Sequence, residues 1–94
     1  ITTISSGDGG SYPVAELRMS SYKNNRLCYI PEHLIIRHVE KVLNDDAADN
    51  DSQADPYFRE RIDWALALLK GYAEALKTMR AGTEIFHDKF GNGM

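Results

Sequence analysis

The stretch DPYFRERIDWALALLKGYAEALKTM, residues 55–79, carries the strongest structural signal in the sequence. Asp55 and Pro56 form a typical helix start, because aspartate caps free backbone N–H groups and proline fits the first helical turn. Apolar side chains then recur at alternating spacings of four and three residues, the pattern of an amphipathic helix. They are Phe58, Ile62, Ala65, Leu69, Tyr72, Leu76 and Met79. A long helix is therefore predicted here.

The apolar surface of this helix is wider than one neighbouring helix would cover. Beside the regular positions lie Trp64, Leu66, Leu68 and Ala73. Either the helix is covered on two sides by the rest of the chain, or it packs on a second copy of itself. Gly71 weakens it by about 1 kcal/mol relative to alanine, or permits a close neighbour. We expect a homo-oligomer through the helix over residues 57–80.

Two short strands are predicted before this helix. Within residues 14–20, apolar Ala15, Leu17 and Met19 alternate with polar residues, which is the period of a half-buried strand. Residues 25–30 contain RLCYI, which is rich in residues that favour strands. The simplest arrangement is an antiparallel hairpin that pairs 14–20 with 25–30.

A first helix is predicted over residues 31–44. Pro31 and Glu32 suit a first helical turn, and apolar residues follow at helical spacing. These are Ile35, Ile36, Val39, Val42 and Leu43. Residues 44–56, NDDAADNDSQADP, contain five aspartates and no large apolar side chain, so they are expected to connect the two helices.

The expected fold is α+β, with an N-terminal β-hairpin followed by a two-helix antiparallel hairpin. The second helix is long, and a dimer is expected. Residues 1–12 form a flexible N-terminal segment, and residues 13–94 form a single domain. The glycine-rich SGDGGS stretch of this segment lacks a lysine and precedes a predicted strand, so it is not interpreted as a phosphate-binding loop.

Composition narrows the classes of function. The chain has 94 residues, a formal net charge of −3 and a pI near 5.5, which argues against unspecific attraction to a polyanion. Its single cysteine, Cys28, cannot form an internal disulfide and is expected as a small apolar residue of a strand. The sequence has neither a membrane-length apolar run nor a signal-peptide pattern, so a cytoplasmic protein without a membrane partner is expected.

Residues 26–43, RLCYIPEHLIIRHVEKVL, resemble the first half of a ribbon-helix-helix DNA-binding domain. Residues 55–72 are similar in pattern to the second helix of that family. The resemblance implies a dimer whose paired strands enter the major groove of DNA. The positions that would face the bases are Asn25, Leu27 and Tyr29, of which only Asn25 is a typical base reader. Aspartates stand where the family holds a phosphate, and they would repel it.

The acidic connection invites comparison with a calcium-binding loop. Asp49, Asp51, Gln53, Asp55 and Glu60 have the oxygen spacing of an EF-hand loop. However, Ala54 stands at the sixth place, where an EF-hand loop requires glycine. Pro56 stands at the eighth place and has no backbone N–H to donate. The histidines at positions 33 and 38 are about 140° apart around a helix, which does not suit chelation. A solvated acidic linker is favoured, and no metal or cofactor is predicted.

Two surfaces remain as candidates for binding, although each can also be interpreted as ordinary solvated surface. One is a basic and aromatic patch on the predicted hairpin, formed by Arg18, Tyr22, Lys23, Asn25, Arg26 and Tyr29. The other is the acidic loop, formed by Asp45, Asp46, Asp49 and Asp51.

No arrangement of nucleophile, base and orienting residue is found, so the protein is not expected to be an enzyme. The sequence favours a non-enzymatic interaction protein, such as an adaptor or inhibitor of a larger nucleic-acid-handling complex. Small inhibitors of phages and mobile elements are of this type, and the partner would be another protein. The alternative is a transcriptional regulator of the ribbon-helix-helix type.

Overall fold

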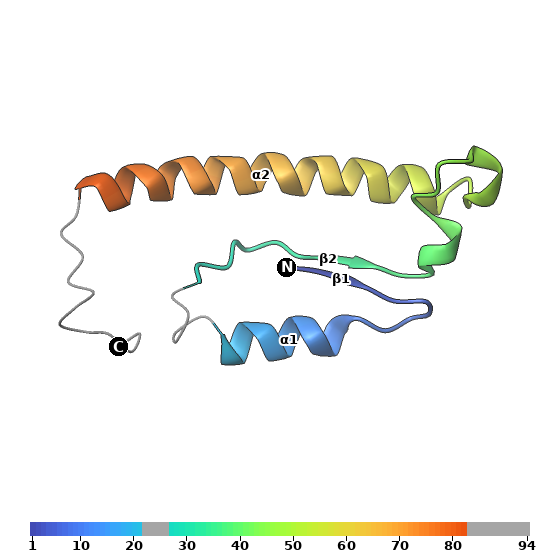
Figure 1. Cartoon of the computed structure of the whole chain (residues 1–94), viewed down its shortest axis with the longest axis horizontal. Coiled ribbons are helices and arrows are strands. Elements are labelled where there is room, and N and C mark those ends of the chain that lie inside the picture. Colours follow the sequence, from blue (N-terminus) through green and yellow to red (C-terminus); the bar gives the residue numbers. More distant parts are fainter. Residues whose placement is uncertain (22–26, 83–94) are drawn as a thin grey trace.

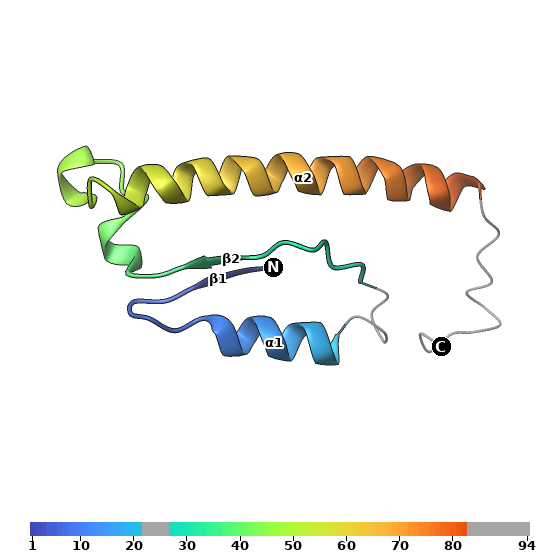
Figure 2. The same ribbon diagram turned by 180° about the vertical axis from the view of Figure 1, so that it is seen from behind.

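A two-stranded sheet lies between two helices in the computed structural model, which describes residues 1–21 and 27–82 (Figure 1). In chain order the elements are β1 (Thr2–Ile4), α1 (Ser11–Ser20), β2 (Leu34–Ile36) and α2 (Ala54–Gly82). Two short 3-10 turns, η1 (Val39–Lys41) and η2 (Ala47–Asp49), lie between β2 and α2. Helix α1 packs on β1 and α2 packs on β2, so one helix lies on each side of the sheet, as both views show (Figures 1 and 2), while Ile4 of β1 stays exposed.

The two strands are parallel and are connected through α1. Thr2, Thr3 and Ile4 pair with Leu34, Ile35 and Ile36, in that order. The pairing continues beyond the strands, where the Ser5 N–H donates to the Ile36 carbonyl over 2.9 Å. Parallel strands require a long crossover, and α1 supplies it. The buried residues of this small core are Thr3, Val14, Leu34, Ile36, Val42 and Ala65.

The expected antiparallel hairpin over 14–20 and 25–30 is wrong. Residues 11–20 are helical, and residues 27–30 are not part of a strand. Pro13 lies in the first turn of α1, where its missing N–H costs nothing, and alanine, glutamate, leucine, arginine and methionine all favour helices. The alternation of apolar residues had suggested a strand, but only Val14 of this helix is buried. Residues 22–26 lie outside the described part of the chain.

The helix expected over residues 31–44 is also wrong, because this stretch contains β2 and η1. Isoleucine and valine are stiff at χ1 and pack well in strands. A strand covered on both faces has a continuous apolar run instead of an alternating one, which fits the sequence Leu34-Ile35-Ile36. A helix face and such a strand are hard to distinguish in a short apolar run.

The long second helix is confirmed. It begins at Ala54, slightly earlier than predicted, because the Asp51 carboxylate accepts the backbone N–H groups of Gln53 and Ala54 over 2.9 and 2.8 Å. Pro56 lies in its first turn and Gly82 is its last residue. With 29 residues, α2 is about 43 Å long.

Residues 1–12 were expected to be a flexible segment, but they contain β1 and the start of α1. The glycine-rich residues 5–10 therefore join a strand to a helix, contrary to the sequence interpretation. Gly10 has φ of 109°, and a Cβ atom there would lie 2.5 Å from Cγ2 of Ile35. Only glycine fits this close approach of the loop to β2. Cys28, expected in a strand, is exposed and lies outside both strands.

Candidate functional site

The apolar seam of α2 divides into two parts with different surroundings. We call Phe58, Ile62 and Ala65 the proximal seam. It faces the sheet: Ala65 is 8% exposed, and Phe58 and Ile62 are partly buried. Phe58 lines one pocket together with Leu34 and Ile35 of β2. Ala65 lines another together with Leu34, so this part of the helix lies against β2. The proximal seam is therefore part of the hydrophobic core.

We call Leu69, Tyr72, Leu76 and Met79 the distal seam. Among the residues that the structure describes, Leu69 and Met79 are each 47% exposed and Tyr72 is 38% exposed. Leu66, beside the seam, is 56% exposed. Contiguous exposed apolar surface of this kind marks interaction sites more often than single exposed leucines do. Leu76 is partly buried, as Phe58 and Ile62 are. The same helical face thus begins as core and continues as a surface on which Leu69, Tyr72 and Met79 are accessible.

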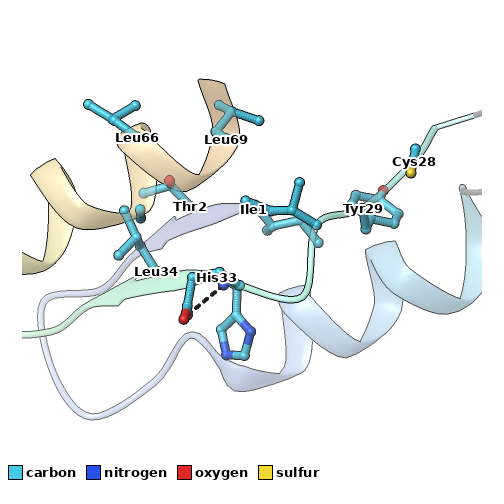
Figure 3. A pocket seen from close by; sticks show the side chains of 11 residues that line it. Ile1, Thr2, Cys28, Tyr29, His33, Leu34, Leu66 and Leu69 are labelled. Atoms are coloured by element: carbon cyan, nitrogen blue, oxygen red, sulfur yellow. Dashed lines mark hydrogen bonds between the residues drawn. The ribbon is translucent and has the colours of Figure 1, made fainter. Parts of the chain in front are cut away.

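A groove marks the boundary between the two parts (Figure 3). Leu66 and Leu69 of α2 line it, together with Thr2 and Leu34 of the sheet and Ile1, which precedes β1. The groove has a volume of about 140 Å³, and the segment that precedes β2, which includes Cys28, also lines it. The groove leads from the core towards the distal seam.

Polar contacts fix α2 beside this groove. Nη2 of Arg61 donates to Oε1 of Glu32 over 2.8 Å, and the Glu32 side chain also accepts the His33 N–H. The Arg61 guanidinium lies 5.3 Å from the centre of the Trp64 ring, within range of a cation–π interaction. These contacts tie the helix to the segment before β2, so the position of the distal seam is set by the fold.

The acidic loop is compact and hydrogen-bonded. Asn44 and Asn50 hold it together, since the Asn44 N–H donates to Oδ1 of Asn50 and Nδ2 of Asn50 donates to the Asn44 carbonyl. Asp46 accepts the Ala48 N–H, and Asp51 caps α2. Asp45 and Asp49 are exposed. Asp46 and Asp51 are exposed as well, so all four predicted aspartates present charge at the surface, and two of them also hold the loop together.

Hydrogen bonds keep two of the carboxylates in this region charged. The N–H groups of Ala54 and Gln53 lower the pKa of Asp51. The Arg59 guanidinium, 2.8 Å away, and the Leu43 N–H lower the pKa of Asp55. Asp55 was predicted as the helix cap, but its carboxylate instead joins α2 to the chain after η1.

The predicted hairpin patch is not assembled as expected. Arg18 lies on α1, and its Nη2 donates to the carbonyls of Ile30 and Glu32 over 3.1 and 3.4 Å. Its guanidinium stacks on the Tyr29 ring, whose hydroxyl is hydrogen-bonded to Ser21. Both side chains thus join α1 to the segment before β2. The other four members, at positions 22, 23, 25 and 26, lie outside the described residues.

The carboxyl ends of the two strands bring together residues that the sequence interpretation did not connect. Nε of Arg37 donates to the carbonyls of Asp8 and Gly9, over 3.0 and 3.3 Å. The His38 ring is 3.0 Å from the Asp8 carboxylate. If β1 had been predicted, the sequence would have drawn attention to this site, because a glycine-rich loop between a strand and a helix is a known signal of phosphate binding. With three residues, however, β1 is too short to show a periodic pattern.

Within residues 1–21 and 27–82, no group of three or more histidine, cysteine, aspartate or glutamate side chains is placed to hold a metal ion. None of the helices in these ranges has the length and apolar character that crossing a membrane requires. No family model, curated protein or solved structure matches the chain. The ribbon-helix-helix resemblance therefore stays a prediction, and the helix it requires over 31–44 is not formed.

Proposed function

We propose that this protein is a non-enzymatic interaction protein that pairs with a second copy of itself through the distal seam of α2. The observation that carries the proposal is the contrast in burial along one helical face. Ala65 is buried against the sheet, whereas Leu69, Tyr72 and Met79 remain at least 38% exposed. These three side chains form an accessible apolar face among the residues that the structure describes, and such a face favours association.

The chemistry of the distal half suits a helical partner. Its apolar residues keep the spacing of four and three that allows side chains of two helices to interlock. At about 100° per residue, Glu74 lies opposite the centre of the distal seam, whereas Lys70 and Lys77 lie beside Leu66 at the edge of the apolar face. The four seam positions between 69 and 79 are therefore apolar, and two lysines border them on one side. Two identical faces of this kind complement each other in a two-fold dimer.

Self-association can be tested with a matched pair of substitutions. Leu69→Glu places a charge in the distal seam, whereas Ala67→Glu places the same charge on the opposite face of the helix. We expect the unchanged protein and Ala67→Glu to elute as dimers in size-exclusion chromatography with light scattering. Leu69→Glu should elute as a monomer with an unchanged circular dichroism spectrum. Equal masses for the two variants would remove the distal seam from the proposal.

The acidic loop is the proposed contact for a separate, basic protein partner, as an adaptor or inhibitor would require. Asp45 and Asp49 carry this part of the proposal, because Asp46 and Asp51 are engaged in capping. The double variant Asp45→Asn/Asp49→Asn should lose partners that the unchanged protein retains from a lysate of the source organism, at unchanged melting temperature. Asp63→Asn on α2 is the matched control. Identical sets of retained proteins would exclude the loop from recognition.

A further inference from the structure

A second candidate site lies beyond the carboxyl end of β2, away from the distal seam. It is a cavity of about 320 Å³ between η1 and the start of α2. This volume is at the lower end of the range for small-molecule sites. In sheets of parallel strands, ligands bind preferentially outside the carboxyl ends of the strands. The residues that line the cavity are Arg37, His38, Lys41, Val42, Asp51, Ala54 and Phe58.

One wall of the cavity carries fixed positive charge. Arg37 is held in place because its guanidinium donates to the carbonyls of Asp8 and Gly9 and, over 3.4 Å, to Oγ of Ser11. Lys41 follows at the end of η1 and lines the same cavity. The hydrogen bonds of Arg37 occupy the Nε–Nη2 edge of its guanidinium, so Arg37 would act on a phosphate group through its charge and its remaining N–H groups, and Lys41 as a point charge.

The rest of the lining is of a different chemical kind. Val42 is 2% exposed and Phe58 is partly buried, so together they offer an apolar floor. An aromatic side chain at such a floor can stack on a planar ring. Asp51 also lines the cavity. Its Oδ1 accepts the N–H groups of Gln53 and Ala54, so Oδ2 is the atom that would accept a hydrogen bond from a hydroxyl group of a ligand. A simple inorganic anion would use only the cationic wall.

The backbone at this cavity is strained on both sides of η1. His38 has φ of 49° and Leu43 has φ of 63°. Positive φ is uncommon for residues other than glycine, and for a bulky side chain such as leucine it is a clear outlier. Strained residues of this kind cluster at ligand-binding positions, where the surrounding structure holds them. Here the two residues flank the turn that carries Lys41 and Val42, so the surrounding structure holds this turn in place.

From these observations we infer that the cavity binds an organic monophosphate with an aromatic body, such as a nucleoside monophosphate. Arg37 and Lys41 bind the phosphate, Val42 and Phe58 contact the ring, and Asp51 accepts a hydroxyl group. The inference uses no residue of the distal seam. Its outcome is therefore independent of whether the chain forms a dimer.

The test compares AMP with its two parts, adenosine and inorganic phosphate, by NMR titration of the uniformly ¹⁵N-labelled full chain. The amide signals of Val42, Ala54 and Phe58 report on the cavity. We expect AMP to shift them with at least about tenfold higher affinity than either part alone, because each part uses only half of the lining. Equal affinity for AMP and inorganic phosphate, or no shift with AMP at millimolar concentration, would overturn the inference.

Lys41→Gln removes one charge from the cavity at an exposed position, with little expected effect on folding. It should weaken AMP binding about tenfold, the usual effect of losing one charge-assisted hydrogen bond. Lys41→Arg should retain binding, and Lys70→Gln, on the outer face of α2, is the matched control. If Lys41→Gln and Lys70→Gln bind AMP equally well, the cationic wall is not the phosphate site.

Discussion

The two halves of α2 have the same kind of sequence but different surroundings. The proximal seam lies on the sheet and includes Ala65, at 8% exposure, whereas the distal seam continues the same face with Leu69 and Met79 at 47%. Periodicity records that a face is apolar, but it does not record what covers that face. The sequence pattern therefore predicts the helix, but it does not predict which half of the apolar face is buried in the fold.

The largest expected effect comes from placing one charge in each half. Ala65→Glu would bury a carboxylate against Leu34 without a partner, which should cost at least about 3 kcal/mol of unfolding free energy. Ala73→Glu adds the same charge beside the distal seam, where it stays in solvent. Urea unfolding of both variants in dilute solution should show a large loss only for Ala65→Glu. Equal losses would mean that both halves are buried.

A smaller effect is expected from Gly10→Ala, which tests whether the sheet under the proximal seam depends on the glycine-rich loop. The added Cβ would meet Ile35 at 2.5 Å and would force alanine to adopt φ of 109°. We expect a loss of about 2 kcal/mol. Gly7→Ala is the control, since nothing lies within 4 Å of its Cβ position. Thermal melting that does not separate the two variants would show that the loop adapts.

A still smaller effect, in the opposite direction, is expected from Gly71→Ala in the distal half. A Cβ atom at Gly71 meets nothing within 4 Å among the described residues. Alanine should therefore stabilise the helix by about 1 kcal/mol through its higher propensity. Chemical unfolding measures this gain, and light scattering measures the dimer. Gly71 lies one turn from Ala67, away from the distal seam, so the variant should still pair. A stabilised monomer that no longer pairs would contradict pairing through the distal seam.

The smallest effect concerns the ion pair at the start of the proximal half. Arg59 lowers the pKa of Asp55, so the resulting stability is present above the ordinary carboxyl value of 3.8 and is lost as pH falls through the lowered value. Asp55→Asn should melt a few degrees below the unchanged protein at neutral pH, and the difference should shrink below about pH 4. A difference that does not change with pH would exclude the charge as its cause.

Sequence reasoning predicted α2 because its signal is repeated over many turns and begins with an aspartate–proline pair. It failed for β1, α1 and β2, which have three, ten and three residues. The first is too short for a pattern, and the apolar spacing around the other two suggested the wrong element. Their identity depends on contacts between distant parts of the chain, such as the pairing of Thr3 with Ile35. A local pattern cannot reveal such pairing, and tertiary contacts decide short apolar runs.

The candidate sites show the same difference between features of a single element and contacts between distant parts of the chain. The wide apolar surface of α2 was visible in the sequence, since it depends on one helix alone. The contacts by which Arg18 and Tyr29 hold α1 to the segment before β2 could not be predicted, because they connect residues more than ten positions apart. The cavity at Arg37 and Lys41 was also missed, because the strand that positions it had been predicted as a helix.

Hydrogen exchange along α2, measured by mass spectrometry at several protein concentrations, tests the central claim most directly. Peptides that cover the proximal half should be protected at every concentration, because the sheet covers them. Peptides within residues 66–81 should exchange quickly in dilute solution and become protected as the concentration rises and dimers form. Exchange of residues 66–81 that stays the same from the most dilute to the most concentrated sample would contradict pairing through the distal seam.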